Sequence, residues 1–213
     1  FTYLRPAPEP VYLPLINKDI SPLLPPAVVI AQGHGFDACG LPSLEKLKIW
    51  WEESPYQAFG LYMGGVHYPS TCTQVDAAWV DSASQQGWQF MPLWVGPQAP
   101  CTTYKYRISY DPTVAYQQGR SEAVLASTAA TNLGLANSNL GGTLIYYDME
   151  AYGATNTACI TAVGAFMNGW SERLHELGSV AGIYSSACSP PPSYLAALPN
   201  PPDDFWGAYY LRS

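Results

Sequence analysis

The sequence predicts an α/β fold of the TIM-type (β/α) barrel class, incomplete at its C-terminal end, with a proline-rich N-terminal arm. Short apolar runs alternate with longer stretches of helical periodicity along the 213 residues, which is the pattern of parallel βαβ units. No G-x-G-x-x-G motif or P-loop follows the first apolar run, so nothing supports a nucleotide-binding doubly wound sheet. We count six strands, whereas a complete barrel has eight strands in about 250 residues.

The first 27 residues predict an arm rather than a regular element. Seven prolines lie between Pro6 and Pro26, which disfavours both helix and central strand. The arm also carries apolar side chains such as Tyr12 and Leu13, where a free linker would be polar. We therefore expect residues 1–27 to pack on the barrel or on a neighbouring copy of the chain, and residues 28–213 to form the barrel domain.

The first half of the barrel domain predicts three strands and two helices. The first strand runs toward Asp37. Ser43 is a suitable N-cap for the first helix, and Gly87 ends the second helix because glycine adopts the left-handed conformation common after helix C-termini. In chain order, these elements are strand 28–30, helix 43–53, strand 58–63, helix 75–86 and strand 88–95.

The second half begins with a long loop over residues 96–111 and continues the alternation. Asp111 is the expected N-cap of a long helix that starts at Pro112, since proline fits the first helical turn. Gly134 and Gly178 end the two long helices. In chain order, these elements are helix 112–133, strand 143–150, helix 157–177, strand 180–185, helix 193–198 and strand 205–210.

The composition argues against nucleic-acid and membrane functions. The chain holds 9 Lys and Arg against 16 Asp and Glu, so it lacks the basic stripes that bind phosphates. No apolar run reaches the roughly 18 residues that span a membrane. Charged residues make up only 12%, while 16 Tyr and 7 Trp suit a surface that meets sugars or other neutral polymers. A well-packed barrel with tyrosines at its strand ends is the alternative interpretation.

Five cysteines lie far apart and form no C-x-x-C pair, which argues against a structural zinc site. Scattered cysteines in a chain with few charges are typical of disulfide-bonded proteins, so we expect a secreted protein, extracellular or associated with the cell wall. Cys72 and Cys101 follow neighbouring strands and are expected to bond to each other. Cys159 has Cys39 and Cys188 as alternative partners.

Two acidic residues share one face of a predicted strand. Side chains alternate along a strand, so Asp148 and Glu150 point the same way, with Cα atoms roughly 6.6–7 Å apart. Both lie at the carboxyl end of the strand, where barrel enzymes gather their catalytic groups. Repulsion and burial raise the pKa of at least one of them, and glycosidic cleavage needs one protonated and one ionised carboxyl group. Asp37 has the same placement on the first strand.

Two alternative roles are open to these three acids. Single acidic residues often cap helices or pair with arginine. The acids could also bind Mg²⁺, but this ion prefers one or two carboxylates together with phosphate or water, and the sequence contains no phosphate cradle. We therefore favour a site of carboxylate chemistry without a metal or cofactor.

A series of short motifs runs through the chain in a fixed order. They are 35–39 (GFDAC), 42–43 (PS), 54–56 (SPY), 60–65 (GLYMGG), 87–88 (GW) with Pro92, 95–101 (VGPQAPC), 147–152 (YDMEAY) and 182–186 (GIYSS). Together they resemble a glycoside-hydrolase-like domain family of secreted bacterial proteins over about residues 33–210. That family is similar to the Chalaropsis-type lysozymes, which cleave the glycan of peptidoglycan on a β/α barrel.

The resemblance implies a role for each acid. Glu150 would be the general acid, Asp148 its partner carboxylate or a group that orients the substrate, and Asp37 would support both. The lysozymes also use an acid from a late strand, which has no counterpart up to Ser213. A hydrolase of a polysaccharide such as peptidoglycan is thus the first hypothesis. The alternatives are a carbohydrate-binding domain without turnover, and a structural subunit of a surface assembly docked through its arm.

Several side chains near the predicted strand ends are candidates for sugar contacts. Aromatic rings stack on sugar rings, and an amide can hydrogen-bond sugar hydroxyl groups. The alternative role for the aromatic residues is packing in the core, and the alternative role for the amide is to hold its loop in place. The candidates are Tyr62, Trp94, Tyr152, Tyr184 and Gln98.

Overall fold

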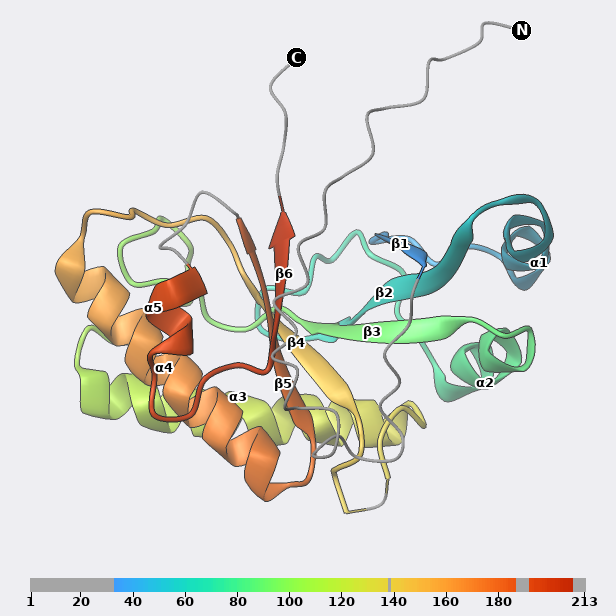
Figure 1. Cartoon of the computed structure of the whole chain (residues 1–213). Helices are drawn as coiled ribbons and strands as arrows, with labels where there is room; N and C mark the ends of the chain where they lie inside the picture. Colours follow the sequence, from blue (N-terminus) through green and yellow to red (C-terminus); the bar gives the residue numbers. More distant parts are fainter. Residues whose placement is uncertain (1–32, 138, 187–191, 209–213) are drawn as a thin grey trace, which may run out of the picture.

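Each strand in the described part of the protein pairs with its neighbour in sequence. The computed structural model describes residues 33–137, 139–186 and 192–208, and in this part of the chain six strands form one parallel sheet in the order β1-β2-β3-β4-β5-β6 (Figure 1). The strands are β1 (His34–Asp37), β2 (Tyr56–Gly64), β3 (Gln89–Trp94), β4 (Leu144–Met149), β5 (Val180–Ser186) and β6 (Asp204–Ala208). One helix lies between each pair of successive strands, which confirms the predicted alternation.

The sheet curls strongly enough to bring its last strand near its second. A Cβ atom added to Gly60 on β2 would lie 2.6 Å from the Cβ atom of Asp37 and 3.0 Å from Cη2 of Trp206 on β6. Only a residue without a side chain leaves space for this approach. The described strands therefore form a curled half-barrel, and Asp37 and Trp206 lie on its concave face.

Two of the five described helices begin directly after the N-caps that the sequence predicts, Ser43 and Asp111. The helices are α1 (Leu44–Glu53), α2 (Ala77–Gln85), α3 (Pro112–Asn132), α4 (Thr157–Glu176) and the short α5 (Pro192–Ala196). The Ser43 hydroxyl accepts a hydrogen bond from the backbone N–H of Lys46, and the Asp111 carboxylate accepts one from Thr113. Gly87, Gly134 and Gly178 all have positive φ angles after helix ends, as predicted.

The two long helices pack against each other at two glycines. A Cβ atom on Gly119 of α3 would lie 2.0 Å from the carbonyl oxygen of Phe166, and one on Gly169 of α4 would lie 2.2 Å from that of Tyr116. This close pair covers the convex side of β4, where Tyr147 contacts Trp170 edge to face with ring centroids 5.1 Å apart. The other face of β4 is therefore the one available for a site.

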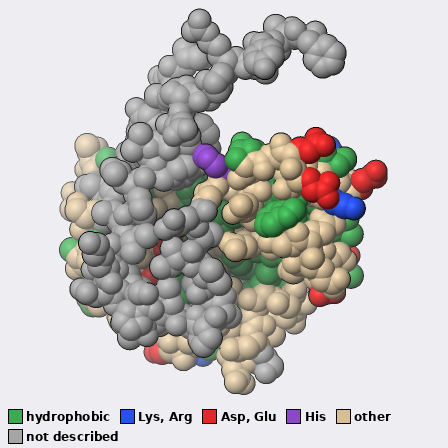
Figure 2. Space-filling view, turned by 45° about the vertical axis from the view of Figure 1, so that its right-hand side comes forward, with side chains coloured by type: hydrophobic (Ala, Val, Ile, Leu, Met, Phe, Trp, Pro, Cys, Tyr) green, Lys and Arg blue, Asp and Glu red, His purple; other side chains and the backbone are tan. Residues whose placement is uncertain are grey.

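Charged side chains gather over α1 on the face drawn in Figure 2, where most other described surface is uncharged. The exposed charged residues of α1 are Glu45, Lys46, Lys48, Glu52 and Glu53. Within the described residues, no helix has the length and apolar character needed to cross a membrane.

Two predicted strands fall at least partly outside the described residues. The first described strand is β1, which ends at Asp37 in register with Gly60, whereas a strand was predicted at 28–30. The strand predicted at 205–210 corresponds to β6 up to Ala208, and residues 209 and 210 are not described. Residues 28–30 and the proline-rich arm 1–27 lie outside the described residues, so the predicted packing of the arm stays a prediction.

The predicted Cys72–Cys101 disulfide is wrong. Cys72 bonds to Cys39, with Cα atoms 4.8 Å apart, because their loops leave the neighbouring strands β1 and β2. Cys101 bonds to Cys159 in the first turn of α4, with Cα atoms 5.8 Å apart. Both alternatives for Cys159 are therefore also wrong, and Cys188 lies outside the described residues.

Candidate active site

Strand β4 presents two acids with different exposure. Tyr147 and Met149 are fully buried on the helix side of the strand, so Asp148 lies on the opposite, concave side. Asp148 is only 3% exposed and is aligned with Tyr184 on β5. Glu150 follows the last residue of the strand and is exposed. The pair thus consists of a buried carboxyl group and an accessible one at the carboxyl end of the sheet.

Asp148 has no hydrogen-bond donor for one of its buried oxygens. Its Oδ1 atom is buried and accepts no hydrogen bond from the described residues. Burial, followed by the nearby charges of Glu150 and Asp37, raises the pKa of Asp148 to about 7. The carboxyl groups predicted to converge are thus close enough to act on one another, and Asp148 keeps a proton up to near-neutral pH.

Asp37 reaches this group from the other end of the half-barrel. It is the last residue of β1, it is exposed, and its Oδ2 atom accepts a hydrogen bond of 3.0 Å from the Tyr62 hydroxyl on β2. Burial and the charges of Asp37 and Asp148 raise the pKa of Tyr62 well above its usual range. Tyr184 also contributes to that shift, so two of the three tyrosines predicted to contact sugar, Tyr62 and Tyr184, lie beside the acids.

Gln98 holds the backbone that carries the acids. Its side chain is fully buried, and its Nε2 atom donates to the carbonyl oxygens of Asp148 (2.8 Å) and Gly96 (3.1 Å). Its Oε1 atom accepts a hydrogen bond of 2.9 Å from the backbone N–H of Glu150. Both ends of the Gln98 amide, which was predicted to bond to sugar hydroxyl groups, bond instead to the protein backbone. The structure therefore favours the alternative role, in which Gln98 holds its loop in place.

Two other predicted sugar contacts lie away from the acids. Trp94 is buried on the helix side of β3, and its Nε1 atom donates to Glu122 of α3 at 2.6 Å. Tyr152 is buried in the core, where burial and the neighbouring Tyr194 of α5 raise its pKa. Both residues therefore fit the alternative role of core packing. Trp94 lies behind the sheet against α3, and Tyr152 lies in the core near Tyr194 of α5.

Tyr104 is a site residue that the sequence patterns did not predict. It lies in the loop 96–111, and its pKa is raised by burial and then by the charges of Glu150 and Asp148. The loop has no helical or strand periodicity that would orient a side chain. Loops at the carboxyl end of a sheet often carry binding residues, and a tyrosine in such a loop is the one sequence signal that could have identified Tyr104.

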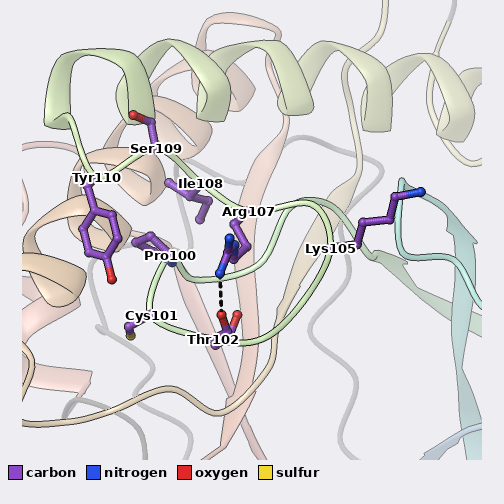
Figure 3. Close-up of a pocket in the computed structure, with 8 residues that line it drawn as sticks. All are labelled: Pro100, Cys101, Thr102, Lys105, Arg107, Ile108, Ser109 and Tyr110. Carbon is purple, nitrogen blue, oxygen red and sulfur yellow. Dashed lines mark hydrogen bonds between the residues drawn. The ribbon is translucent and has the colours of Figure 1, made fainter.

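The same loop encloses an open, polar hollow of about 600 Å³ (Figure 3). Arg107 lies near its centre and donates from Nη1 to the carbonyl oxygen of Thr102 at 3.0 Å, whereas Lys105 points away from it. The three acids are not among its lining residues, which are Pro100, Cys101, Thr102, Lys105, Arg107, Ile108, Ser109 and Tyr110.

Histidine, cysteine and acidic side chains do not gather as a metal site. Within residues 33–137, 139–186 and 192–208, no group of three or more of them could hold a metal ion.

A curled parallel sheet with carboxyl groups at the ends of β1 and β4 is the plan of a TIM-type barrel domain. The chain belongs to the Rv2525c-like, glycoside hydrolase-like domain family, whose model matches residues 49–200. This match confirms the family resemblance found in the sequence motifs. No curated protein matches the chain.

Three solved structures are similar to the chain at low sequence identity. An uncharacterized B. stearothermophilus protein is 17% identical with a TM-score of 0.52, over 76% of this chain and 65% of that one. A sugar phosphate isomerase/epimerase from Parabacteroides distasonis is 10% identical with a TM-score of 0.45, over 76% and 55%. An AP endonuclease, family 2, from Brucella melitensis is 13% identical with a TM-score of 0.41, over 73% and 56%. The chain thus spans about two thirds or less of their lengths.

Proposed function

We propose that this domain hydrolyses glycosidic bonds in an extracellular or cell-envelope polysaccharide of the peptidoglycan type. The observation that carries the proposal is Asp148, a buried carboxyl group with a pKa of about 7 beside the exposed Glu150. Glycosidic cleavage requires one proton and one negative charge at the same bond. Asp148 keeps a proton up to near-neutral pH, and the nearby charge of Glu150 contributes to this raised pKa.

Exposure assigns the roles within the pair. Glu150 lies at the mouth, where a glycosidic oxygen can reach it, so we assign it the role of general acid. The proton held by Asp148 passes to Glu150, and the C–O bond breaks as the leaving oxygen takes it from Glu150. A water molecule then supplies the new hydroxyl group and returns a proton to the pair. Asp148 is the partner carboxyl group, and the Asp37–Tyr62 hydrogen bond orients the sugar from β1 and β2.

Several broader features support the same proposal. The strand order of the half-barrel follows the plan of a TIM-type barrel, and the family that the chain belongs to is glycoside hydrolase-like. Two disulfides are typical of proteins from oxidising compartments, which supports secretion. A net charge of −7 supports a polysaccharide partner rather than nucleic acid. Self-association through residues 1–27 also stays a proposal.

The test is the release of reducing ends from purified peptidoglycan, chitin and neutral glucans by the intact protein and by Glu150→Gln. Release by the intact protein alone would support a hydrolase with Glu150 at its centre. Equal release by both proteins would remove Glu150 from the mechanism. Binding to a polymer without release by either protein would replace the hydrolase by a carbohydrate-binding domain.

A further inference from the structure

Two exposed tyrosines and a histidine cluster at the carboxyl end of the sheet. Tyr104 is 38% exposed and Tyr106 is 45% exposed, on the loop that follows β3. The His67 ring, from the loop after β2, packs against both, with ring centroids 5.1 Å from Tyr104 and 5.6 Å from Tyr106. Large aromatic side chains that stay exposed in a fixed group are a feature of binding surfaces.

The two loops are held in place by hydrogen bonds between them. His67 Nε2 lies 2.8 Å from the carbonyl oxygen of Tyr106, and the His67 backbone N–H donates to Val95 at 2.9 Å. Gly65 has a φ of +112°, and a Cβ atom there would lie 2.2 Å from the carbonyl oxygen of Val95. Glycine is therefore needed where the loop after β2 meets the end of β3.

Each loop is also fixed by its own disulfide. Cys72 ties the loop after β2 to Cys39, and Cys101 ties the loop after β3 to Cys159 on α4. A cluster fixed in this way loses little conformational entropy when a ligand binds, which favours affinity.

The cluster is joined to the acids through Gln98. The Gln98 backbone N–H donates to the carbonyl oxygen of Tyr106 at 3.1 Å, and its side chain accepts from the backbone N–H of Glu150 at 2.9 Å. A single residue thus separates Tyr106 from Glu150 along this path. The charges of Glu150 and Asp148 also raise the pKa of the Tyr104 hydroxyl, so this side chain lies within electrostatic reach of the two acids.

We propose that Tyr104, Tyr106 and His67 form a stacking platform for a pyranose ring of the bound polysaccharide, next to Asp148 and Glu150. The platform rests on the proposed function, because it would bind the chain whose bond the acids cleave. The C–H groups on one face of a pyranose are apolar and pack against aromatic rings, while its hydroxyl groups stay polar. Lys105 Nζ lies 5.0 Å from the Tyr106 ring centroid and adds a hydrogen-bond donor at the platform edge.

The test is a set of binding isotherms on insoluble peptidoglycan, chitin and β-glucan with the full chain. We expect Tyr104→Ala and Tyr106→Ala to weaken binding about tenfold each, since each removes one stacking ring. Tyr104→Phe and Tyr106→Phe keep the rings and are expected to bind like the intact protein. Tyr56→Ala is the matched control, because Tyr56 is 39% exposed but begins β2 at the opposite end of the sheet.

The outcomes separate the platform from the proposed hydrolase. Wild-type binding by a folded Tyr104→Ala/Tyr106→Ala double variant would overturn the platform, even if the intact protein cleaves the polymer. Binding that depends on the two rings but comes without any release of reducing ends would support the platform and refute the hydrolase. Failure of the intact protein to bind any of the three polymers would overturn the platform. Thermal unfolding of each variant checks that the fold is retained.

Discussion

The side chain of Gln98 bonds to the backbone between Asp148 and Glu150, on either side of Met149. Its Oε1 atom accepts the N–H of Glu150 at 2.9 Å, and its Nε2 atom donates to the carbonyl oxygen of Asp148 at 2.8 Å. The strand β4 ends at Met149, so these bonds replace the sheet hydrogen bonds at the point where the chain leaves the strand. The position of Glu150 therefore depends on a buried amide on another loop.

Replacing Gln98 by leucine is expected to destabilise the protein by roughly 2–4 kcal/mol, because buried backbone groups at Asp148 and Glu150 lose their partners. A displaced Glu150 is also expected to lower turnover by about 100-fold. Urea unfolding and reducing-end release measure the two effects. Gln85→Leu is the control, since Gln85 is exposed and bonds only to Asp81. Wild-type stability of Gln98→Leu would contradict the supporting role.

The raised pKa of Asp148 predicts a characteristic pH dependence of stability. In the unfolded chain this carboxyl group loses its proton near pH 3.8, whereas in the folded protein it keeps the proton to about pH 7. Between these values the folded state binds more protons, so the free energy of unfolding falls as the pH rises. A pKa difference of about three corresponds to about 4 kcal/mol. The charges of Glu150 and Asp37 act on Asp148, and the charge of Asp148 acts in turn on the hydroxyl groups of Tyr62 and Tyr104.

The Asp148→Asn variant isolates this effect. Asparagine stays neutral, so the stability difference between wild type and variant should decline from pH 4 to pH 7 and then level off. Urea unfolding at one-unit pH steps measures the difference curve, and Asp81→Asn on the exposed surface of α2 is the matched control. A difference curve that rises over this range would show that Asp148 is ionised in the folded protein.

Local sequence signals predicted most of the elements and the two carboxyl groups on β4. Ser43, Asp111, Gly87 and Gly178 act through short-range geometry, which is why their caps and turns could be read without knowledge of the fold. The alternation of side chains along a strand is equally local, and it correctly assigned Asp148 to the face opposite Tyr147.

Contacts between distant loops could not be predicted in the same way. The partner of Cys101 depends on how the loop after β3 folds toward α4, and no pattern in the loop encodes that path. Trp94 looked like a strand-end aromatic facing a site, but a register shift between β2 and β3 precedes it, and it lies on the helix side beside Glu122. Tyr104 was missed because no pattern in the loop after β3 indicates where that loop places its side chains.

Gly60→Ala is expected to disturb the concave face of the half-barrel. The new Cβ atom would lie 2.6 Å from the Cβ atom of Asp37, which must move together with its hydrogen bond to Tyr62. Overpacking of this kind costs about 1–3 kcal/mol. Urea unfolding measures the loss, and Gly40→Ala is the control, since nothing lies within 4 Å of a Cβ atom there. Equal stability of the two variants would argue against the close approach of β1, β2 and β6.

We expect the Cys101–Cys159 disulfide to stabilise the protein by more than loop closure alone predicts, because it also fixes the loop that carries Tyr104 and Tyr106. Closing a loop with a sequence separation of 58 residues is worth about 4 kcal/mol in the chain-entropy treatment. Cys101→Ser/Cys159→Ser should lose at least this amount in urea unfolding and should also weaken polymer binding, because Tyr104 and Tyr106 lie in the freed loop.

Cys39→Ser/Cys72→Ser, with a separation of 33, is the comparison and releases the loop of His67 instead. Peptide mapping without reductant checks both pairings, and recovery of a Cys72–Cys101 peptide would refute this arrangement of the two loops.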